Sequence, residues 1–219
     1  MQTLLIDLDG TLSDSAPGIL ASLRRAFADV GVPEPDEATM RSLLGPPFYE
    51  ALPPLFGADR VPAIIEAYRS YYDTAMFDTR LYAGMVDVLT DLRARGVTLA
   101  VATSKPEAYA VPIAEHLGIA GYFQTIGGDA LDGSRDTKAK VVASVLERLG
   151  SPDPAGVLML GDRSHDVDGA RAHGIDCLGA GWGYGRPGEL ADAVEVFATP
   201  YRLLAAHERI FGGRSAATA

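Results

Sequence analysis

Short apolar segments alternate with amphipathic segments through the second half of the chain, and this alternation restricts the possible folds more than any other feature. The amphipathic segments repeat apolar residues at helical spacing and end at or near a glycine. We expect helices at residues 85–95, 106–117, 137–149 and 167–173, and strands at residues 97–102, 122–126, 157–160 and 175–178. Strands that alternate with helices in this way predict an α/β fold with a doubly wound parallel sheet.

A further strand and a helical insertion are expected near the amino terminus. Residues 3–8 form a short apolar run with acidic residues at its end, which is typical of a strand buried in a parallel sheet. Residues 16–80 carry helical patterns and no strand signal. We therefore predict an α/β catalytic core formed by residues 1–15 and 81–212, an inserted all-helical cap at residues 16–80 and a flexible tail at residues 213–219.

Composition excludes several classes of protein. The chain has 219 residues, of which 47% are hydrophobic and 22% charged, values that are ordinary for a globular protein. Its formal net charge is −10, and its lysines and arginines are scattered, so we expect no nucleic-acid partner. It shows neither a secretory signal nor an apolar run of the roughly 20 residues that a membrane helix requires. We predict a cytoplasmic enzyme that does not bind membranes and is a monomer or a homodimer.

Polar residues follow the expected strands at several points. Ligands bind outside the carboxyl ends of the strands in open α/β sheets, so polar residues at these points carry the most functional weight. They lie at residues 7–14, 103–105 and 161–166, and Lys138 opens one of the predicted helices. Together these segments predict a phosphate-binding site.

Asp7 and Asp9 are the most informative of these polar residues. They stand two positions apart at a strand end, so their carboxylates can point the same way and would repel each other without a cation between them. Asp162 and Asp166 follow another strand and offer hard oxygen ligands, the kind that Mg²⁺ prefers. A magnesium ion would also offset the charge repulsion between an attacking carboxylate and a phosphate dianion.

Thr103 and Lys138 complete the candidate phosphate site. Thr103 offers a hydroxyl near a helix start, where backbone N–H groups can bind an anion. Lys138 offers a compact positive charge for the oxygens of a transferred phosphoryl group. Lys140 is an alternative, and we favour Lys138 because it lies earlier in the first turn of the predicted helix.

Taken in order, these segments resemble the motifs of the haloacid dehalogenase superfamily, in particular its phosphatases of the phosphoglycolate phosphatase-like group with a helical cap of the C1 type. The D-x-D-G-T motif is matched at residues 7–11, and the G-D-x-x-x-D motif at residues 161–166. Thr103 matches the Ser/Thr of the second motif, and Lys138 is matched to the lysine of the third. The resemblance covers nearly the whole chain and implies a Rossmann-like core with an inserted cap.

The resemblance implies that the chain hydrolyses a small phosphorylated metabolite in two steps with the help of Mg²⁺. Asp7 would attack phosphorus and form an aspartyl-phosphate, while Asp9 would protonate the leaving oxygen and then activate water. Mg²⁺ would be held by the Asp7 carboxylate, the backbone carbonyl of Asp9 and Asp162.

The remaining site residues would bind the phosphate or support the groups that do. The residues expected to contact the phosphate are Thr103, Ser104, Lys138 and Gly10. Thr11 and Asp166 are expected to support these residues without contacting the phosphate themselves. The carboxylate of Asp166 would act either near the metal, through water, or by orienting the lysine.

Other functions fit parts of the sequence. A phosphosugar mutase of the same superfamily would share the nucleophile, but the cap turn at residues 45–48 offers no obvious arginine or histidine to support it. The same turn offers no lysine for a Schiff base, which counts against a phosphonatase. A receiver-like phosphoacceptor module also phosphorylates an aspartate, and Asp9 and the helical insertion argue against it. Asp9 also argues against true dehalogenases, whose motif resembles D-x-Y. The apolar cap turn favours a small phosphomonoester, such as phosphoglycolate or a nucleotide monophosphate.

Several aromatic side chains and a histidine close to these motifs are expected to have structural roles. Tyr68 and Tyr72 are predicted to pack in the core or at a hinge. His165 is predicted to be exposed or to support other groups, not to bind the metal. Trp182 and Tyr184 belong either to the entrance of the site or to an ordinary loop.

Overall fold

The sheet at the centre of the protein is wholly parallel. The computed structural model describes residues 2–132 and 134–211, so the predicted tail at residues 213–219 lies outside the described residues. The six strands lie in the order β5-β4-β1-β6-β7-β8. Their bounds are β1 Thr3–Ile6, β4 Thr98–Pro106, β5 Thr125–Asp129, β6 Val157–Gly161, β7 Asp176–Ala180 and β8 Glu195–Phe197. This order, with crossovers on both sides of β1, is the doubly wound arrangement expected from the alternation of strands and helices.

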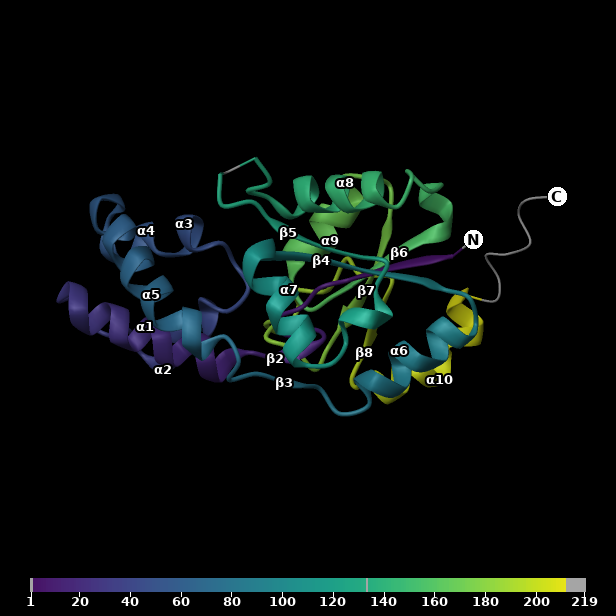
Figure 1. Cartoon of the computed structure of the whole chain (residues 1–219), viewed down its shortest axis with the longest axis horizontal. Helices are drawn as coiled ribbons and strands as arrows, with labels where there is room; N and C mark the ends of the chain where they lie inside the picture. The colour runs from purple at the N-terminus through teal and green to yellow at the C-terminus, as the bar shows by residue number, and fades with distance from the viewer. Residues whose placement is uncertain (1, 133, 212–219) are drawn as a thin grey trace.

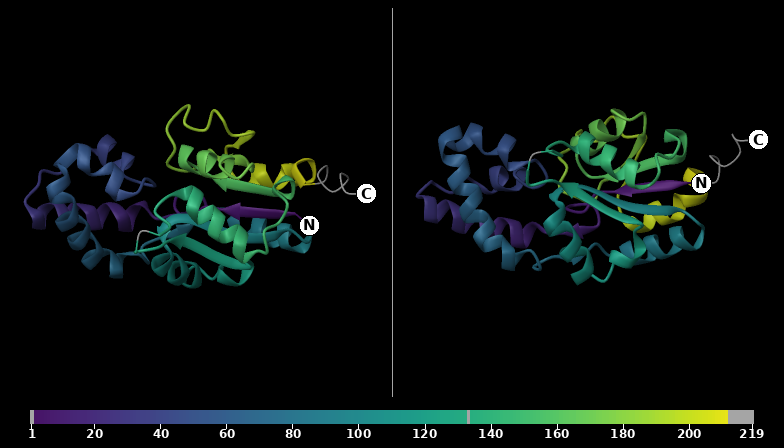
Figure 2. Two further views of the ribbon diagram at one scale, coloured as in Figure 1. Left: turned by 90° about the horizontal axis from the view of Figure 1, so that it is seen from above. Right: turned by 45° about the horizontal axis from the view of Figure 1, so that its top comes forward.

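Helices cover both faces of the sheet (Figures 1 and 2). The helices α8 (Lys138–Arg148) and α9 (Ser164–Arg171) lie on one face, and α6 (Met85–Ala94), α7 (Glu107–His116) and α10 (Pro200–Phe211) lie on the other. Strand β1 is buried on both faces. Leu4 and Ile6 pack under α6 and α7, whereas Leu5 packs under α8 and α9. Truncating Leu5 to alanine would cost about 2–5 kcal/mol of stability.

Residues 16–75 form a helical unit at one end of the sheet (Figure 1). It consists of α1 (Ala16–Val30), α2 (Glu37–Ser42), α3 (Phe48–Ala51), α4 (Pro53–Phe56), the short 3₁₀ turn η1 (Ala58–Arg60) and α5 (Val61–Ala75). The unit has its own core, in which α1 and α5 contribute Leu23, Phe27 and Ile64. Its largest helix pair is therefore held together by apolar packing that is separate from the two cores of the sheet.

The ends of α1 show how the sequence sets its length. Ser15 precedes the helix, Pro17 lies in its first turn, and Gly31 follows its last residue with a φ of 70°. The N–H of Gly31 donates to carbonyl groups of the last turn. Glycine adopts this left-handed conformation without a steric penalty, which explains why the helix stops there.

Two short antiparallel strands connect the helical unit to the sheet. They are β2 (Ser13–Asp14) and β3 (Arg80–Leu81), and they were not predicted. The pair holds together the two chain segments that pass between the sheet and the helical unit. The carboxyl end of β1 points toward this unit (Figures 1 and 2), so the loop after β1 faces it.

Some predicted boundaries were wrong. Helix α9 begins at Ser164, not at residue 167, because the Asp166 carboxylate accepts the backbone N–H of Arg163 and so caps the first turn. Residues 164–166, which precede the predicted start of this helix, therefore belong to it. No element was predicted at residues 189–211, where the structure has β8 and α10.

None of the described helices combines the length and the apolar character needed to cross a bilayer. The cytoplasmic location stays a prediction, as does the choice between a monomer and a homodimer.

Candidate active site

The candidate site lies at the carboxyl ends of the central strands. Asp7 directly follows β1, and Asp162 directly follows β6, the neighbour of β1 on one side. Thr103 lies in β4, the neighbour of β1 on the other side. Lys138 is the first residue of α8. Because adjacent parallel strands end at the same edge, side chains that are far apart in the sequence meet here.

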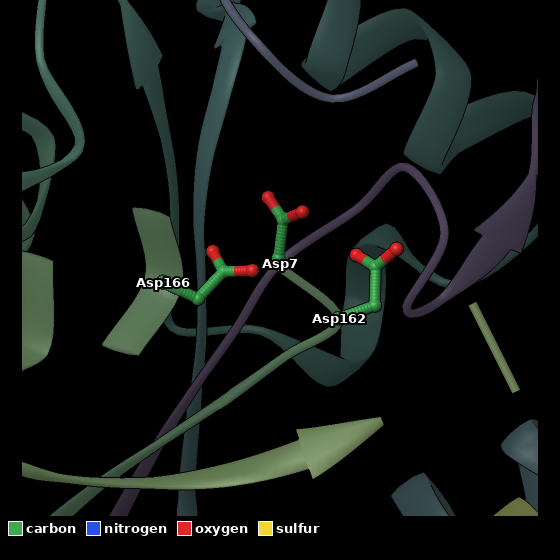
Figure 3. A group of neighbouring side chains, drawn as sticks. All are labelled: Asp7, Asp162 and Asp166. Carbon is green, nitrogen blue, oxygen red and sulfur yellow. The ribbon is translucent and has the colours of Figure 1, made fainter. Parts of the chain in front are cut away.

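Three buried carboxylates form an acidic cluster at this edge. Asp7, Asp162 and Asp166 each offer an oxygen, and these oxygens all lie within 4.8 Å of one another. Figure 3 shows the three side chains gathered around one space. Burial raises the pKa of Asp162, and Asp166 and Asp7 raise it further. Burial also raises the pKa of Asp7, although Lys138 opposes this shift. A set of hard oxygen donors that is costly to ionise without a cation fits Mg²⁺.

Lys138 lies against two members of the cluster. Its Nζ is 2.7 Å from Asp7 Oδ1 and 2.6 Å from Asp166 Oδ1. Burial lowers the pKa of Lys138, but these two carboxylates outweigh that effect and hold the pKa above its usual value. Lys140, the alternative, is exposed and pairs with Asp136. Lys138 is thus the one of the two lysines that reaches Asp7, and Asp166 both belongs to the acidic cluster and contacts this lysine.

Asp9 is directed away from the acidic cluster. Its Oδ1 accepts a hydrogen bond of 2.7 Å from the Ser15 hydroxyl, and its Oδ2 lies 2.8 Å from Lys105 Nζ. The carboxylate of Asp9 is therefore not part of the acidic cluster. Its orientation suits a role on the substrate side of the site.

Lys105 lies in the polar segment at residues 103–105 singled out from the sequence, but no role was predicted for it. Besides its contact with Asp9, its Nζ donates a hydrogen bond of 2.7 Å to the hydroxyl of Tyr72 on α5. Its position directly after Thr103 and Ser104 was a signal that could have drawn attention to it. Lys105 connects the sheet to the helical unit.

Thr103 and Thr11 each support one of the acidic side chains. Thr103 is buried, and its hydroxyl lowers the pKa of the Asp7 carboxyl. The Thr11 hydroxyl donates to Asp162 at 3.1 Å. Ser104 is only half-buried and lies at the opening of the site.

Gly10 has to be glycine for two reasons. Its φ is +81°, and a Cβ atom at this position would lie 2.3 Å from Asp162 Oδ2. The loop after β1 can approach Asp162 this closely only without a side chain. The predicted contact of Gly10 with phosphate stays a prediction.

The loop after β7 supports the segment that carries Asp9. The Tyr184 hydroxyl accepts the N–H groups of Ser15 and Ala16 at 2.7 and 3.0 Å and donates to Asp14. The Trp182 indole N–H donates to the carbonyl of Thr11 at 3.0 Å. This loop is therefore more than a connection, because it fixes the chain between β1 and α1.

Two adjoining pockets open over the site. The smaller one, with about 290 Å³ of empty space, is lined by Asp7, Asp9, Gly45, Thr103, Ser104, Lys105, Lys138, Arg163, His165 and Asp166. His165, which was predicted to have a minor role, thus faces the same space as Asp7. The larger pocket, with about 750 Å³ of empty space, shares Asp9, Gly45, Ser104 and Lys105 with the first and extends into the helical unit. Tyr68 and Tyr72 line it while also packing in the core of that unit.

A second contact joins the sheet to the helical unit beside these pockets. The guanidinium of Arg163 donates to the carbonyl of Leu44 and pairs with Glu189 at 2.6 Å. Gly45, which lies next to this guanidinium, has a φ of +101°, a backbone conformation that favours glycine. The turn at residues 45–48 lines the larger pocket, and Gly45 also lines the smaller one.

Comparison with known proteins gives one consistent family. The model of a family described as haloacid dehalogenase-like hydrolase matches residues 4–180. The tyrosine-protein kinase PtkA of Mycobacterium tuberculosis is 46% identical over 186 residues, which cover 84% of this chain and 64% of PtkA. The chain therefore spans less than two thirds of the length of that relative.

Two further relatives have different names. A 5'-nucleotidase of Pseudomonas aeruginosa is 38% identical over 190 residues, which cover 85% of this chain and 86% of the nucleotidase. Phosphoglycolate phosphatase 1 of the same species is 30% identical over 200 residues, covering 84% of this chain and 71% of that protein. Among solved structures, the haloacid dehalogenase-like hydrolase SP0104 of Streptococcus pneumoniae superposes with a TM-score of 0.88 at 30% identity, covering 94% of this chain and 98% of SP0104.

Proposed function

Because the chain belongs to the haloacid dehalogenase-like hydrolase family, we propose that it is a Mg²⁺-dependent phosphatase that hydrolyses small phosphomonoesters through an aspartyl-phosphate on Asp7. One observation carries this proposal. Asp7 lies next to the Lys138 ammonium and close to two further buried carboxylates, and it lines a pocket that Asp9 also lines. A nucleophile, a positive charge for phosphate oxygens, a metal site and an acid/base group therefore face one space.

The acidic cluster supports Mg²⁺ as the cofactor. Lys138 balances one of the negative charges of Asp7, Asp162 and Asp166, and a divalent cation would balance the others. We propose that Asp7 and Asp162 hold the ion, together with the backbone carbonyl of Asp9, and that Asp166 acts mainly by holding Lys138. When bound, Mg²⁺ would neutralise charge on the phosphoryl group and orient it for in-line displacement.

In the first step, a carboxylate oxygen of Asp7 attacks phosphorus and the bond from phosphorus to the leaving oxygen breaks. Lys138 and the Thr103 hydroxyl stabilise the charge on the phosphoryl oxygens. Asp9 gives its proton to the leaving oxygen, and the product alcohol departs with that proton. The contact of Lys105 with Asp9 Oδ2 keeps this carboxyl on the side of the leaving group.

In the second step, Asp9 takes a proton from a water molecule that attacks the phosphorus of the aspartyl-phosphate. The bond between phosphorus and Asp7 breaks, inorganic phosphate leaves, and both carboxyl groups return to their starting states. Thr11 and Gly10 take no part in the proton transfer of this step. They contribute by keeping Asp162 in place.

We further propose that residues 16–80 act as a cap domain over a core formed by residues 1–15 and 81–212. The contacts of Lys105 with Tyr72 and of Arg163 with Leu44 join the two parts on either side of the pockets. A cap in this position excludes water from the site and supplies contacts to the leaving group.

The names of the relatives leave the leaving group and the acceptor open. All the possible reactions begin with the attack on phosphorus. They differ in the final acceptor of the phosphoryl group, which is water in hydrolysis, another position of a sugar phosphate in a mutase and a tyrosine in a tyrosine kinase. The test is to incubate the purified chain with a panel of phosphomonoesters and Mg²⁺, and to measure inorganic phosphate and free alcohol together.

Equal amounts of phosphate and alcohol, lost in the presence of a chelator and in Asp7→Asn, would support a phosphatase. The variant Asp132→Asn, at an exposed turn, is the matched control. A product that keeps its phosphate would indicate a mutase instead, and hydrolysis that persists in Asp7→Asn would refute the nucleophile.

A further inference from the structure

Helix α1, the first helix of the helical unit, begins without the cap that its own residues would normally supply. Ser15 is the N-cap residue, but none of the described backbone N–H groups of α1 donates to the Ser15 side chain. Pro17 lies in the first turn and has no N–H group. The N–H groups of Ser15 and Ala16 therefore need an acceptor from another part of the chain, because an N–H group that is shielded from water and has no partner is costly.

Tyr184 supplies this acceptor from the loop after β7. Its hydroxyl oxygen accepts the N–H of Ser15 at 2.7 Å and the N–H of Ala16 at 3.0 Å, which uses both of its lone pairs. The hydroxyl hydrogen is donated to Oδ1 of Asp14 at 3.0 Å. Burial raises the pKa of Tyr184, so the hydroxyl keeps this hydrogen. A single hydroxyl group thus caps the start of α1 and holds the short strand β2 that precedes it.

The Ser15 side chain is directed at Asp9 instead of the helix. Its hydroxyl donates to Oδ1 of Asp9 at 2.7 Å, and Lys105 lies 2.8 Å from Oδ2 on the other side of the carboxyl group. Rotation of a carboxyl group about the bond to its Cβ atom is otherwise broad, and contacts at both oxygens restrict it. The position of the Ser15 hydroxyl depends on the Ser15 backbone, which Tyr184 holds.

The backbone of Tyr184 has a separate contact with the acidic cluster. Its N–H donates to Oδ2 of Asp162 at 2.7 Å. Replacing Tyr184 by phenylalanine removes the hydroxyl and keeps both this N–H and the ring, which lies against Gly10. The contact with Asp162 can therefore be kept while the contact with Ser15 is removed.

We propose that Tyr184 is a positioning residue for the acid/base group: its hydroxyl holds the backbone of Ser15, and the Ser15 hydroxyl holds the carboxyl group of Asp9 in the direction of the leaving oxygen. The inference rests on the phosphatase activity proposed above, in which Asp9 protonates that oxygen. Tyr184 itself touches neither the phosphate nor the leaving group in this role. Its loss should therefore affect the transfer of the proton more than the attack on phosphorus.

The test compares two substrates that differ in their need for a proton. Benzyl phosphate releases a strongly basic alkoxide, which has to be protonated as it leaves, whereas p-nitrophenyl phosphate releases a weakly basic phenolate that leaves without a proton. In Tyr184→Phe, kcat/KM is expected to fall by about tenfold or more for benzyl phosphate and by less than about threefold for p-nitrophenyl phosphate. The quantity kcat/KM covers the steps up to the departure of the leaving group, so the second step does not obscure the result. An equal loss for both substrates would overturn the inference.

Further variants test whether Tyr184 acts through Ser15. Ser15→Ala removes the hydroxyl between Tyr184 and Asp9 and should show the same selective loss with benzyl phosphate. The double variant should then lose no more than Ser15→Ala loses alone, because both changes remove one connection. Losses that multiply in the double variant, or no selective loss in Ser15→Ala, would overturn the inference.

Tyr71→Phe is the matched control. The Tyr71 hydroxyl donates to Asp29 at 2.5 Å, so this variant also removes a tyrosine hydroxyl that contacts α1, but near the other end of that helix. It should keep the ratio between the two substrates at the value of the wild type. A changed ratio in Tyr71→Phe would mean that any loosening of α1 has this effect, which would also overturn the inference.

A structural measurement separates this inference from the proposed activity. Crystal structures of the wild type and of Tyr184→Phe show the orientation of the Asp9 carboxyl group without any turnover. The hydrogen bond between Ser15 and Asp9 is expected to be lost in the variant. If the wild type hydrolyses no phosphomonoester, the phosphatase proposal fails, and the positioning of Asp9 by Tyr184 still stands if the carboxyl group turns in the variant. An unchanged Asp9 in Tyr184→Phe would overturn the inference whatever the activity.

Discussion

The ammonium nitrogen of Lys105 lies 2.8 Å from Oδ2 of Asp9, and both side chains are almost completely buried. Burial lowers the pKa of Lys105, but Asp9 more than offsets this effect, so the pKa is raised and the lysine stays charged. The same nitrogen donates to the Tyr72 hydroxyl and lies 4.6 Å from the centre of its ring. One cation therefore connects the proposed acid/base group to the helical unit.

Replacing Lys105 by methionine is expected to lower both activity and stability. Asp9 would lose its ion-pair partner in a buried position, which costs about 3 kcal/mol of unfolding free energy. The proposed proton donor would also be less well oriented, so kcat should fall by about tenfold or more. Steady-state kinetics and chemical denaturation measure the two effects. Tyr72→Phe, which removes only the hydroxyl, should have a smaller effect on both, and a Lys105→Met variant with normal kcat would contradict this role.

Lys138 and Lys140 should differ sharply although they lie two residues apart. In Lys138→Ala the buried carboxylates of Asp7 and Asp166 lose their counter-charge, so kcat/KM should fall by about a hundredfold or more. Lys140→Ala removes an exposed pair with Asp136 and should change kcat/KM less than about twofold. Phosphatase assays of the two variants side by side give the answer. Similar losses in both would contradict the assignment of the phosphate lysine.

Mg²⁺ is expected to stabilise the folded protein through the acidic cluster. At saturating Mg²⁺ the Tm should rise by several degrees, because the ion binds the folded state and relieves repulsion among Asp7, Asp162 and Asp166. In Asp162→Asn this rise should largely disappear, whereas the metal-free variant should be at least as stable as the metal-free wild type, since a buried charge has been removed. Differential scanning calorimetry with and without chelator measures both quantities. An undiminished Mg²⁺ effect in Asp162→Asn would show that the ion binds elsewhere.

Glu107 should make stability depend on pH in the acid range. Burial alone would raise the pKa of Glu107, but ion pairs with Arg148 and Arg135 outweigh burial and lower the pKa below 4.5. A carboxylate with a lowered pKa in the folded state stabilises the protein above its unfolded-state pKa, and this contribution is lost as the pH falls through the folded-state value.

Glu107→Gln should therefore reduce the unfolding free energy by about 1 kcal/mol near neutral pH. The difference between variant and wild type should shrink as the pH falls below about 4.5. Urea denaturation at several pH values tests this expectation. A difference that stays constant into the acid range would mean that packing, not charge, accounts for the effect.

Much of the sheet could be predicted because its signals are local. A few neighbouring residues are enough to recognise the apolar run that contains β1 and the helices that end at glycine. The strand β8 and the paired strands β2 and β3 were missed. They are only two or three residues long, and their pairing depends on neighbours that are distant in the sequence.

In the candidate site, too, some residues could be predicted from local signals and others could not. Asp7, Asp162 and Lys138 could be found from the sequence because each follows a strand or opens a helix, and parallel strands bring such positions to one edge. The choice between Lys138 and Lys140 needed the structure. Both lie in the first turn of α8, and only the direction of that turn decides which side chain points at Asp7.

The sequence by itself determined the type of fold and the charged residues at the ends of its central strands. Both follow from the order of residues alone, because that order sets the spacing of apolar residues and the position of each charged residue after a strand. The tertiary structure alone decided how the helical unit lies over these residues. It brought Tyr72 to Lys105 and Leu44 to Arg163. These contacts join segments with separate hydrophobic cores, and the way two such bodies pack depends on the shapes of their whole surfaces, which no local pattern encodes.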